Sequence, residues 1–365
     1  MKKILLLETA VSFYGIKRGG SYIQANYYRN LLHKKGYLSK IHVGFTNKNN
    51  IARLLRIISE VRKADYILGF GTPLLNVYVQ WLCFILRKKG IFCTDTIIVA
   101  LQIINDHLKR ELYKKRFLIH AYIQHITNFL LTKIPPPRLN LVNMASCQYV
   151  KDKLVNTAYY PKDNKFLYPR VEIKKRNKKD NSKNRKVLFY GILYRGRGII
   201  DLLNACRLLW QKGYQFKLMI MGWPVEPLTE KALMDEIKDE ERDKVIIKQK
   251  QENILEIVED VTAAVLPFRY PCSFQTPYTL LEPMGLGVPV ITTDVGSHTE
   301  WVTHGETGLI CKKENPQDIA DKIETVFTDK KLVDKITGGA IDLLKKRYKE
   351  KDLLLETLKK LEDEA

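Results

Sequence analysis

Cysteine is scarce and unpaired along this 365-residue chain. The six cysteines are scattered, and no two of them form a C-x-x-C pair. A zinc site usually needs such clustering, and a disulfide framework needs an oxidising compartment. We therefore expect neither, and a reducing cytosol fits the sequence.

Long apolar runs are also missing. The longest apolar stretch, residues 73–86, stops at three basic residues and is shorter than the roughly 20 residues that span a bilayer. We interpret it as a helix packed on a sheet, with shallow membrane insertion as the alternative. The apolar run near the first residue is only four residues long, so we expect no signal peptide.

Several catalytic signatures are absent as well. The sequence has no Asp-x-Asp metal motif near a strand end, no HExxH helix and no GxSxG turn. Metal-dependent transfer and serine hydrolysis therefore lose support. We expect no cofactor and no metal ion.

Positive charge is in excess, and it is confined to the first half of the chain. Residues 1–185 hold 35 Lys and Arg against 10 Asp and Glu, whereas residues 186–365 hold 26 against 30, within a net charge of +21. This asymmetry indicates a surface that meets nucleic acid, an anionic membrane or a phosphate-bearing substrate. Charge alone does not choose among these, and a chain that is simply rich in lysine is a further alternative.

Strand and helix patterns alternate along both halves. The first half predicts strands and helices over residues 2–8, 21–36, 65–70, 94–104, 139–146 and 147–156; the second predicts them over 187–191, 199–213, 216–222, 228–243, 245–248, 253–260, 263–268, 277–285 and 288–293. Such alternation predicts α/β domains with parallel sheets covered on both faces. The polar, basic run 174–186 is the predicted linker.

The predicted organisation is two Rossmann-like domains. Residues 1–173 form the first domain, 187–335 the second, and the helices over 336–365 pack back toward the first. In such sheets ligands bind at the carboxyl ends of the strands, where helix amino termini present N–H groups.

The turn Arg195-Gly196-Arg197-Gly198 follows a predicted strand and precedes a predicted helix. Two guanidinium groups beside glycines suit a diphosphate, with surface arginines as the alternative. In the first half, Gly19, Gly20 and Ser21 occupy a similar place, where a plain tight turn explains them equally well.

One carboxylate, Glu282, stands in the apolar run PYTLLEPMGLG. We predict Thr276 as the N-cap of its helix and Pro277 as the first helical residue. Glu282 then lies within about two turns of the amide end, where it would accept hydrogen bonds from sugar hydroxyls; capping its own helix is the alternative. His298 and Glu300, beside the next Gly-containing turn, are candidates for a functional role, with an inert loop histidine as the alternative.

Together these motifs resemble a known family. The pair Gly191 and Gly198, then LPF and LLEPMGLGVPVITTDVGSHTEWVTHGETGLI, resemble the family-4 retaining glycosyltransferases of GT-B fold. The likeness is strong over residues 187–328 and looser before them. It implies two domains facing across a cleft, with a nucleotide-diphospho-sugar bound mainly to the second and the acceptor mainly to the basic first.

The resemblance assigns roles by position. Glu282 matches the second Glu of the family's Glu-x7-Glu motif, which holds the nucleotide ribose, and Arg197 stands where a diphosphate-binding Lys is common. Arg195, Arg197 and Glu282 are the implied catalytic residues. The implied donor contacts are Gly191, Gly198, Thr276, Pro277, Tyr278, Thr279 and Glu282, and the implied phosphate or acceptor loop is Gly19, Gly20 and Ser21.

Two positions depart from the family pattern. The first Glu of the motif falls at Phe274, and the Arg after the strand glycine falls at Ile192. Arg195 would supply the lost charge, and Ser273, Gln275 or Thr276 the lost sugar contact. In the first half, Gln102, Asp106 and His107 follow a predicted strand and would orient the acceptor, with loop or cap roles as the alternative.

The predicted function is transfer of a sugar with retention from a UDP- or GDP-sugar to a hydroxyl of a glycan or lipid-linked acceptor, without metal. The protein is expected to be cytoplasmic, or peripheral at the inner face of an anionic membrane. A catalytically inactive nucleotide-sugar-binding subunit, a sugar-nucleotide epimerase and a nucleic-acid-binding protein are the alternatives; the last lacks any known module.

Overall fold

The computed structural model describes residues 2–8, 20–43, 50–71, 73–94, 141–153, 166–174, 184–193, 195–224, 230–248, 254–271, 276–349 and 353–363. These residues form two compact units. The N-terminal unit holds the described residues up to Arg170 together with Leu353–Asp363, and the C-terminal unit holds Val171–Lys349.

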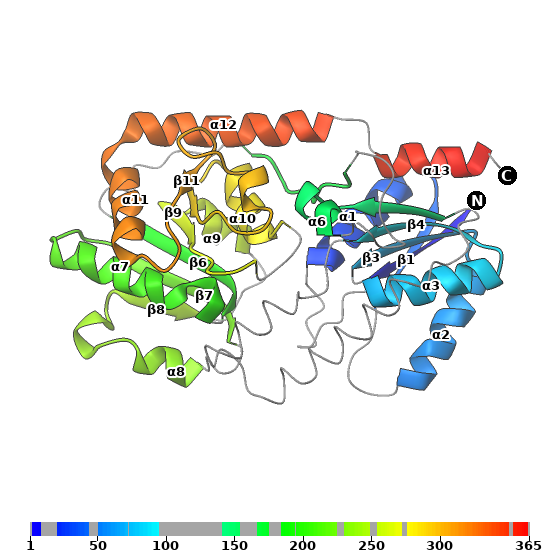
Figure 1. The fold of residues 1–365 in the computed structure, drawn as a ribbon, viewed down its shortest axis with the longest axis horizontal. Helices are drawn as coiled ribbons and strands as arrows, with labels where there is room; N and C mark the ends of the chain where they lie inside the picture. Colours follow the sequence, from blue (N-terminus) through cyan, green and yellow to red (C-terminus); the bar gives the residue numbers. More distant parts are fainter. Residues whose placement is uncertain are drawn as a thin grey trace. The chain divides into compact units, whose positions relative to one another are not determined.

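The N-terminal unit is built on a sheet of five parallel strands (Figure 1). Apolar runs such as ILLL in the first strand suit a sheet that is covered on both faces. In spatial order the strands are β2 (Leu38–Val43), β1 (Lys3–Glu8), β3 (Tyr66–Gly71), β4 (Lys89–Thr94) and β5 (Leu141–Ala145). The helices are α1 (Gly20–Lys34), α2 (Asn50–Lys63), α3 (Pro73–Ile85), α6 (Gln148–Lys153) and α13 (Leu353–Asp363).

Helices pack on both faces of this sheet. On one face, Leu6 and Leu68 lie in a buried cluster with residues of α1 and α13. On the other, Leu5 and Leu7 pack with residues of α2 and α3. Successive side chains of a strand point to opposite faces, so one apolar strand serves both clusters.

The last helix, α13, completes the core of the N-terminal unit. Leu354, Leu358 and Leu361 are almost fully buried in the same cluster as Leu6. The hydroxyl of Tyr37 also donates a hydrogen bond of 3.1 Å to Glu362 Oε2. The helices expected over residues 336–365 therefore divide between the units, because α12 (Lys330–Lys349) belongs to the C-terminal unit.

The C-terminal unit is built on a sheet of six parallel strands. In spatial order they are β11 (Leu309–Ile310), β10 (Val290–Thr292), β9 (Ala263–Leu266), β6 (Lys186–Leu193), β7 (Lys217–Pro224) and β8 (Val245–Lys248). The other helices are α7 (Ile199–Gln211), α8 (Glu230–Asp235), α9 (Ile254–Glu259), α10 (Tyr278–Gly285) and α11 (Pro316–Thr328).

Strand β6 lies inside this sheet, between β9 and β7. Four consecutive residues, 187–190, have no exposed surface, as expected for a strand that is covered on both faces. Glycine is required where β6 and β7 run side by side, because a Cβ at Gly222 would lie 1.7 Å from the carbonyl oxygen of Gly191. The close approach fixes the strand end that precedes the Arg195–Arg197 turn.

The alternation of strands and helices predicted the two parallel sheets correctly. Strands β2 and β4 and helix α2 were missed, and the helix expected over 228–243 is shorter, with α8 followed by a 3₁₀ turn at Asp239–Glu241. The strand expected over 94–104 lies almost wholly outside the described residues. Of residues 73–86, expected to form a helix packed on a sheet, Pro73–Ile85 form α3. Its Val79 and Cys83 lie in the buried cluster that contains Leu5 and Leu7 of β1.

Among the helices of the described residues, none combines the length and apolar character that crossing a membrane requires.

Candidate functional site

The turn after β6 is the best-defined part of the candidate site. It forms a 3₁₀ turn, Arg195–Arg197, and Gly198 is the N-cap of α7 with φ of 72°. A Cβ at Gly198 would lie 2.0 Å from the carbonyl oxygen of Pro267, inside van der Waals contact with backbone. Only glycine combines this left-handed conformation with so close a neighbour.

The two arginines of this turn have different surroundings. Arg195 has a side chain that is 38% exposed and forms an ion pair of 2.8 Å with Glu236. Arg197 is 6% exposed, and its guanidinium lies 4.9 Å from the ring centroid of Phe268. A buried guanidinium over an aromatic ring has few directions open to it, so Arg197 is the better placed of the two for a fixed diphosphate.

Arg197 and α10 meet over Gly191, near the carboxyl end of β6. A Cβ at Gly191, where φ is 129°, would lie 2.7 Å from Arg197 Nη1 and 3.3 Å from Thr279 Cγ2. The absence of a side chain at Gly191 thus lets the Arg197 guanidinium and the Thr279 methyl group lie against the backbone of β6. The hydroxyl oxygen of Thr279 is buried and has no hydrogen-bond partner among the described residues.

The start of α10 differs from the sequence prediction. Pro277, not Thr276, is the N-cap, and the first helical residue is Tyr278. The hydroxyl oxygen of Thr276 instead accepts a hydrogen bond of 2.6 Å from the indole Nε1 of Trp301. The backbone N–H groups in the first turn of this helix therefore have no side-chain cap.

Glu282 lies on α10, three residues after Thr279 and so on the same side of the helix. It is 9% exposed, and its Oε2 accepts a hydrogen bond of 2.8 Å from the hydroxyl of Tyr190. Burial raises the pKa of Tyr190 well above its ordinary value, and the Glu282 charge raises it further. Tyr190 therefore stays a hydrogen-bond donor and holds the carboxylate in place.

Sequence reasoning missed Tyr190 and Phe268. His298 is buried, its ring centroid lies 5.0 Å from that of Phe268, and its Nδ1 lies 2.8 Å from Thr292 Oγ1. The pKa of His298 is lowered to about 3, mainly by burial, with a backbone hydrogen bond to Thr293 acting against this and the positive charge of Arg197 adding to it. One signal was present: Phe268 closes the LPF motif directly after β9.

The structure says less about the remaining predicted site residues. Gly20 and Ser21 are the first two residues of α1, so Gly20, predicted in the turn, lies in the helix instead. Ile192 lies in β6, level with Trp223 of β7. The other predicted residues lie outside the described residues, namely Gly19, Gln102, Asp106, His107, Ser273, Phe274 and Gln275.

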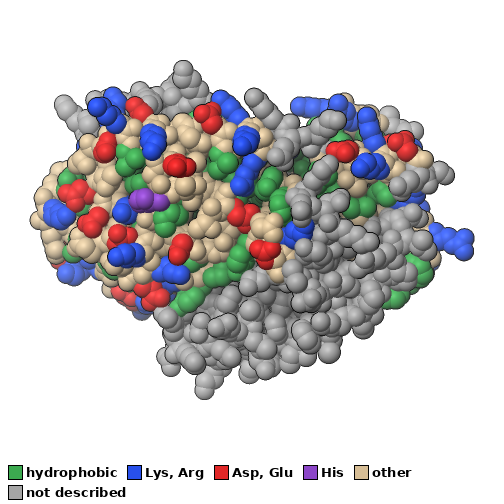
Figure 2. Space-filling model, turned by 45° about the horizontal axis from the view of Figure 1, so that its top comes forward, with side chains coloured by type: hydrophobic (Ala, Val, Ile, Leu, Met, Phe, Trp, Pro, Cys, Tyr) green, Lys and Arg blue, Asp and Glu red, His purple; other side chains and the backbone are tan. Residues whose placement is uncertain are grey.

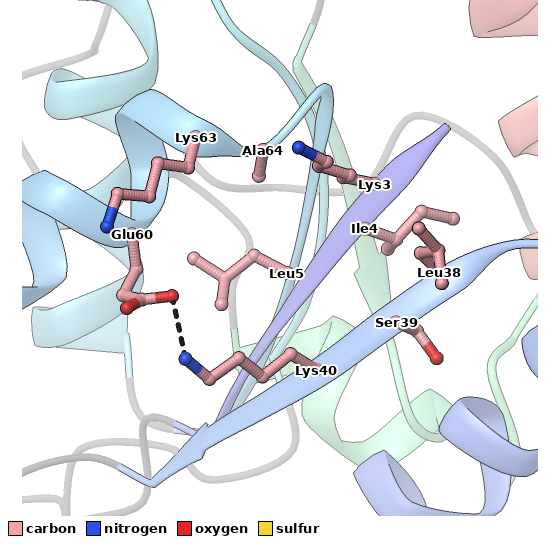
Figure 3. Close-up of a pocket in the computed structure, with 9 residues that line it drawn as sticks. All are labelled: Lys3, Ile4, Leu5, Leu38, Ser39, Lys40, Glu60, Lys63 and Ala64. Atoms are coloured by element: carbon pink, nitrogen blue, oxygen red, sulfur yellow. Dashed lines mark hydrogen bonds and ion pairs between the residues drawn. The ribbon is translucent and has the colours of Figure 1, made fainter. Parts of the chain in front are cut away.

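A pocket of about 360 Å³ lies in the N-terminal unit (Figure 3). It is lined by the first residues of β1 and β2, Lys3 to Leu5 and Leu38 to Lys40, and by the end of α2, where Glu60 forms an ion pair of 3.1 Å with Lys40. These are the amino ends of the strands, opposite to the edge at which parallel sheets bind ligands. The pocket is therefore separate from the candidate site.

Charge on the C-terminal unit is mixed. On the face shown in Figure 2, basic and acidic side chains alternate over this unit, at the left of the view. Within the part of the chain that the structure describes, no three His, Cys, Asp or Glu side chains are grouped so as to hold a metal ion.

Comparison with known proteins finds several that this chain resembles. Residues 170–341 match the family model described as "Glycosyl transferases group 1". Among curated proteins, the chain is 24% identical over 271 residues to "Capsular polysaccharide biosynthesis glycosyltransferase CapM" of Staphylococcus aureus, covering 72% of this chain and 60% of that protein. It is 26% identical to "N-acetyl-alpha-D-glucosaminyl L-malate synthase" of Bacillus anthracis, covering 53% and 49%. The chain thus spans less than two thirds of the length of these relatives.

Solved structures agree on the fold. Anabaena HepE in complex with UDP matches with a TM-score of 0.67 and 18% identity, covering 100% of this chain and 99% of that one. The sucrose-phosphate synthase of Thermosynechococcus elongatus matches with a TM-score of 0.65 and 13% identity, covering 99% and 98%. The predicted α/β fold with two parallel-sheet domains of GT-B type is confirmed.

Proposed function

We propose that this chain, whose residues 170–341 match the model of glycosyl transferases group 1, transfers a sugar, with retention, from a nucleotide-diphospho-sugar to a hydroxyl acceptor. The C-terminal unit binds the donor in this proposal. Arg197 and the first turn of α10 hold the diphosphate, and Glu282 holds the ribose.

One observation carries the proposal: groups from separate elements meet at the carboxyl end of β6. Arg197 Nη1 and the methyl group of Thr279 both lie beside Gly191, and Glu282 is held by Tyr190, the residue before that glycine. A cation, an unbonded hydroxyl and uncapped amides at one strand end form the kind of place in which parallel sheets bind phosphates.

The chemistry follows from these groups. Negative charge gathers on the diphosphate as the bond to the sugar breaks, and Arg197 and the α10 amides stabilise that charge. The acceptor hydroxyl then attacks the sugar on the face that the phosphate leaves, and the departing phosphate takes its proton. We propose that this needs no divalent metal, since the guanidinium supplies the charge that a metal would otherwise provide.

Arg195 has a conditional role in this scheme. To reach a diphosphate, its guanidinium would exchange the carboxylate of Glu236 for phosphate oxygens. Such an exchange costs little, because an exposed ion pair contributes only about 0–1 kcal/mol.

For the donor we propose a UDP- or GDP-sugar. The UDP proposal is supported by Anabaena HepE, which is described in complex with UDP and with UDP-glucose. Within this chain, Tyr190 orients the carboxylate of Glu282 for the hydroxyl pair of a ribose.

For the acceptor we propose a glycan or a lipid-linked saccharide at the inner face of an anionic membrane. The excess of 25 positive charges in residues 1–185 supports it, since each Lys or Arg near an anionic leaflet contributes about 1 kcal/mol. Co-sedimentation with vesicles of phosphatidylglycerol, weakened by salt and absent with neutral lipid, is the expected result. Binding that is indifferent to lipid charge would contradict this part.

The second candidate function is a nucleotide-sugar-binding subunit without activity. Ile192 favours it, because an apolar side chain stands at the end of β6 where the resembled family has Arg. This protein would bind the donor and transfer nothing.

A thermal-shift panel of UDP- and GDP-sugars, followed by a transfer assay, tests both candidates. A true donor at a hundredfold excess over its Kd stabilises the protein by about 2.7 kcal/mol, which raises the Tm by roughly 5 °C or more. Arg197→Met and Glu282→Gln should each remove this shift and the activity. Arg185→Met is the matched control, because Arg185 also lies over a phenylalanine ring, at 4.8 Å from Phe327.

Donor binding with transfer supports the enzyme, and donor binding without transfer supports the inactive subunit. No shift with any nucleotide sugar, or a shift that survives in both variants, would exclude the assigned roles.

A further inference from the structure

The segment Pro267–Arg269, which follows β9, packs against the Arg195–Gly198 turn along its length. The backbone N–H of Arg269 donates a hydrogen bond of 3.0 Å to the carbonyl oxygen of Gly196. The carbonyl of Pro267 lies where a Cβ of Gly198 would be. The turn and the segment therefore cannot move independently.

Phe268, between these two contacts, is enclosed by two side chains. The guanidinium of Arg197 lies 4.9 Å from the centre of its ring, and the His298 ring lies 5.0 Å from it. Its carbonyl accepts a hydrogen bond of 2.6 Å from the hydroxyl of Thr293. The ring is thus held in place, and the guanidinium that lies over it takes its position from the ring.

A partly buried ion pair fixes the far end of the segment. The guanidinium of Arg269 makes two hydrogen bonds to Asp201, of 2.7 Å from Nε and 2.6 Å from Nη2. Asp201 lies in the first turn of α7, three residues after the N-cap Gly198, and its side chain is 7% exposed. A two-bond arginine–carboxylate pair has a defined geometry as well as strength, so it sets where the segment sits relative to α7.

From these contacts we propose that Asp201 and Arg269 are positioning residues for the diphosphate. Their ion pair holds Phe268 under Arg197, and the ring then holds the guanidinium beside Gly191, where it can donate hydrogen bonds to the phosphate oxygens. Neither residue touches the donor in this account. The inference rests on the proposed function, because it concerns the same phosphate-binding group.

The C-terminal unit contains a matched control pair. Arg207 makes two hydrogen bonds to Glu241, of 2.7 and 2.9 Å, and the side chain of Glu241 is 7% exposed. This pair also anchors α7, but at a later turn, and its contacts among the described residues do not include Arg197 or Phe268. Loss of one charged partner should affect stability similarly in the two pairs.

The test is the affinity for UDP and GDP by calorimetry in Asp201→Asn and Glu241→Gln, each compared with the wild type and Arg197→Met. We expect Asp201→Asn to lower the affinity for the nucleotide that binds by about tenfold, without changing the preference between the two bases. Glu241→Gln should leave that affinity within twofold of the wild type. With a nucleotide sugar as substrate, Asp201→Asn should raise KM and lower kcat together, because the same arginine acts in binding and in the reaction.

Phe268 provides a second test that leaves the ion pair intact. Phe268→Leu removes the ring and should lower the affinity for the nucleotide. Phe268→Tyr keeps the ring and should bind the nucleotide with the affinity of the wild type. If Asp201→Asn does not fold, these two variants still test whether Phe268 positions Arg197.

Equal affinities in Asp201→Asn and Glu241→Gln, or in Phe268→Leu and Phe268→Tyr, would overturn the positioning role while Arg197→Met could still confirm the phosphate site. A wild type that binds neither nucleotide would overturn the proposed function, and the inference with it.

Discussion

Two helix ends in this protein place glycine in the left-handed conformation, for different reasons. Gly36 follows α1 in the N-terminal unit with φ of 84°, and Gly198 precedes α7 in the C-terminal unit with φ of 72°. At Gly36 a side chain would meet nothing within 4 Å, whereas at Gly198 it would meet the backbone of Pro267 at 2.0 Å. Gly36 is needed only for the left-handed backbone conformation that ends the helix. Gly198 is needed for its conformation and also for the close approach of Pro267.

The end of α1 is a Schellman motif. The N–H of Tyr37 bonds to the carbonyl of Leu32, and the N–H of Gly36 to that of His33, both at 3.0 Å. Its hydrogen bonds are internal to the helix end. The start of α7 instead depends on Pro267–Arg269, a segment about 70 residues later in the chain, so its conformation is tied to the candidate site.

The largest expected effect separates these two glycines. Gly198→Ala adds a steric clash with backbone to the left-handed strain and should cost about 3–4 kcal/mol of unfolding free energy, with loss of nucleotide binding. Gly36→Ala should cost about 1 kcal/mol, the strain alone. Chemical denaturation of both variants measures the difference. Equal losses of unfolding free energy would contradict the close contact between Gly198 and the backbone of Pro267.

A second effect concerns acid. The pKa of His298 is lowered to about 3 in the folded protein and is near 6.5 when unfolded. Below pH 6.5 the unfolded chain therefore binds a proton that the folded one does not, and stability falls as the pH falls toward 3. Between pH 6.5 and 5 the loss from this residue is about 2 kcal/mol.

His298→Asn provides the measurement, because asparagine does not titrate in this range. Urea denaturation at pH 7 and pH 5 should show a smaller loss of stability in the variant than in the wild type. Identical slopes against pH in the two proteins would show that His298 is not held neutral by burial.

The smallest expected effect lies at the exposed side of the same turn. Glu236→Gln removes the charge that pairs with Arg195, and both side chains are about a third exposed. The cost in unfolding free energy should be below about 1 kcal/mol and should shrink further in 0.5 M salt. A cost as large as that of Gly198→Ala would mean that the whole turn, and not only its buried side, is structurally fixed.

The sequence predicted the elements whose patterns are strong. Strands β1 and β6 are near-continuous apolar runs, and their burial on both faces explains why they could be found. Strand β2, LSKIHV, lies at the edge of its sheet and mixes polar with apolar residues, so it has no comparable signal. Strand β4 was missed because it begins at a lysine within the basic end of an apolar stretch.

For the candidate site, sequence patterns predicted the charged groups and missed what holds them. Arg197 and Glu282 stand out beside glycines and in an apolar run, and both lie near the end of β6. Phe268 and Tyr190 belong to residue types that normally fill cores, so their roles depend on contacts between distant segments. The N-cap prediction for Thr276 was wrong for the same reason, since its partner, Trp301, is 25 residues away.

The return of α13 to the N-terminal unit has a consequence for biosynthesis. Leu354, Leu358 and Leu361 fill the same cluster as Leu6, which is made more than three hundred residues earlier. In a nascent chain emerging from the ribosome, that apolar surface therefore stays uncovered until residues 353–363 have been made, while the described strands of Val171–Lys349 are all made beforehand. The second unit to be synthesised is thus the first that can finish folding.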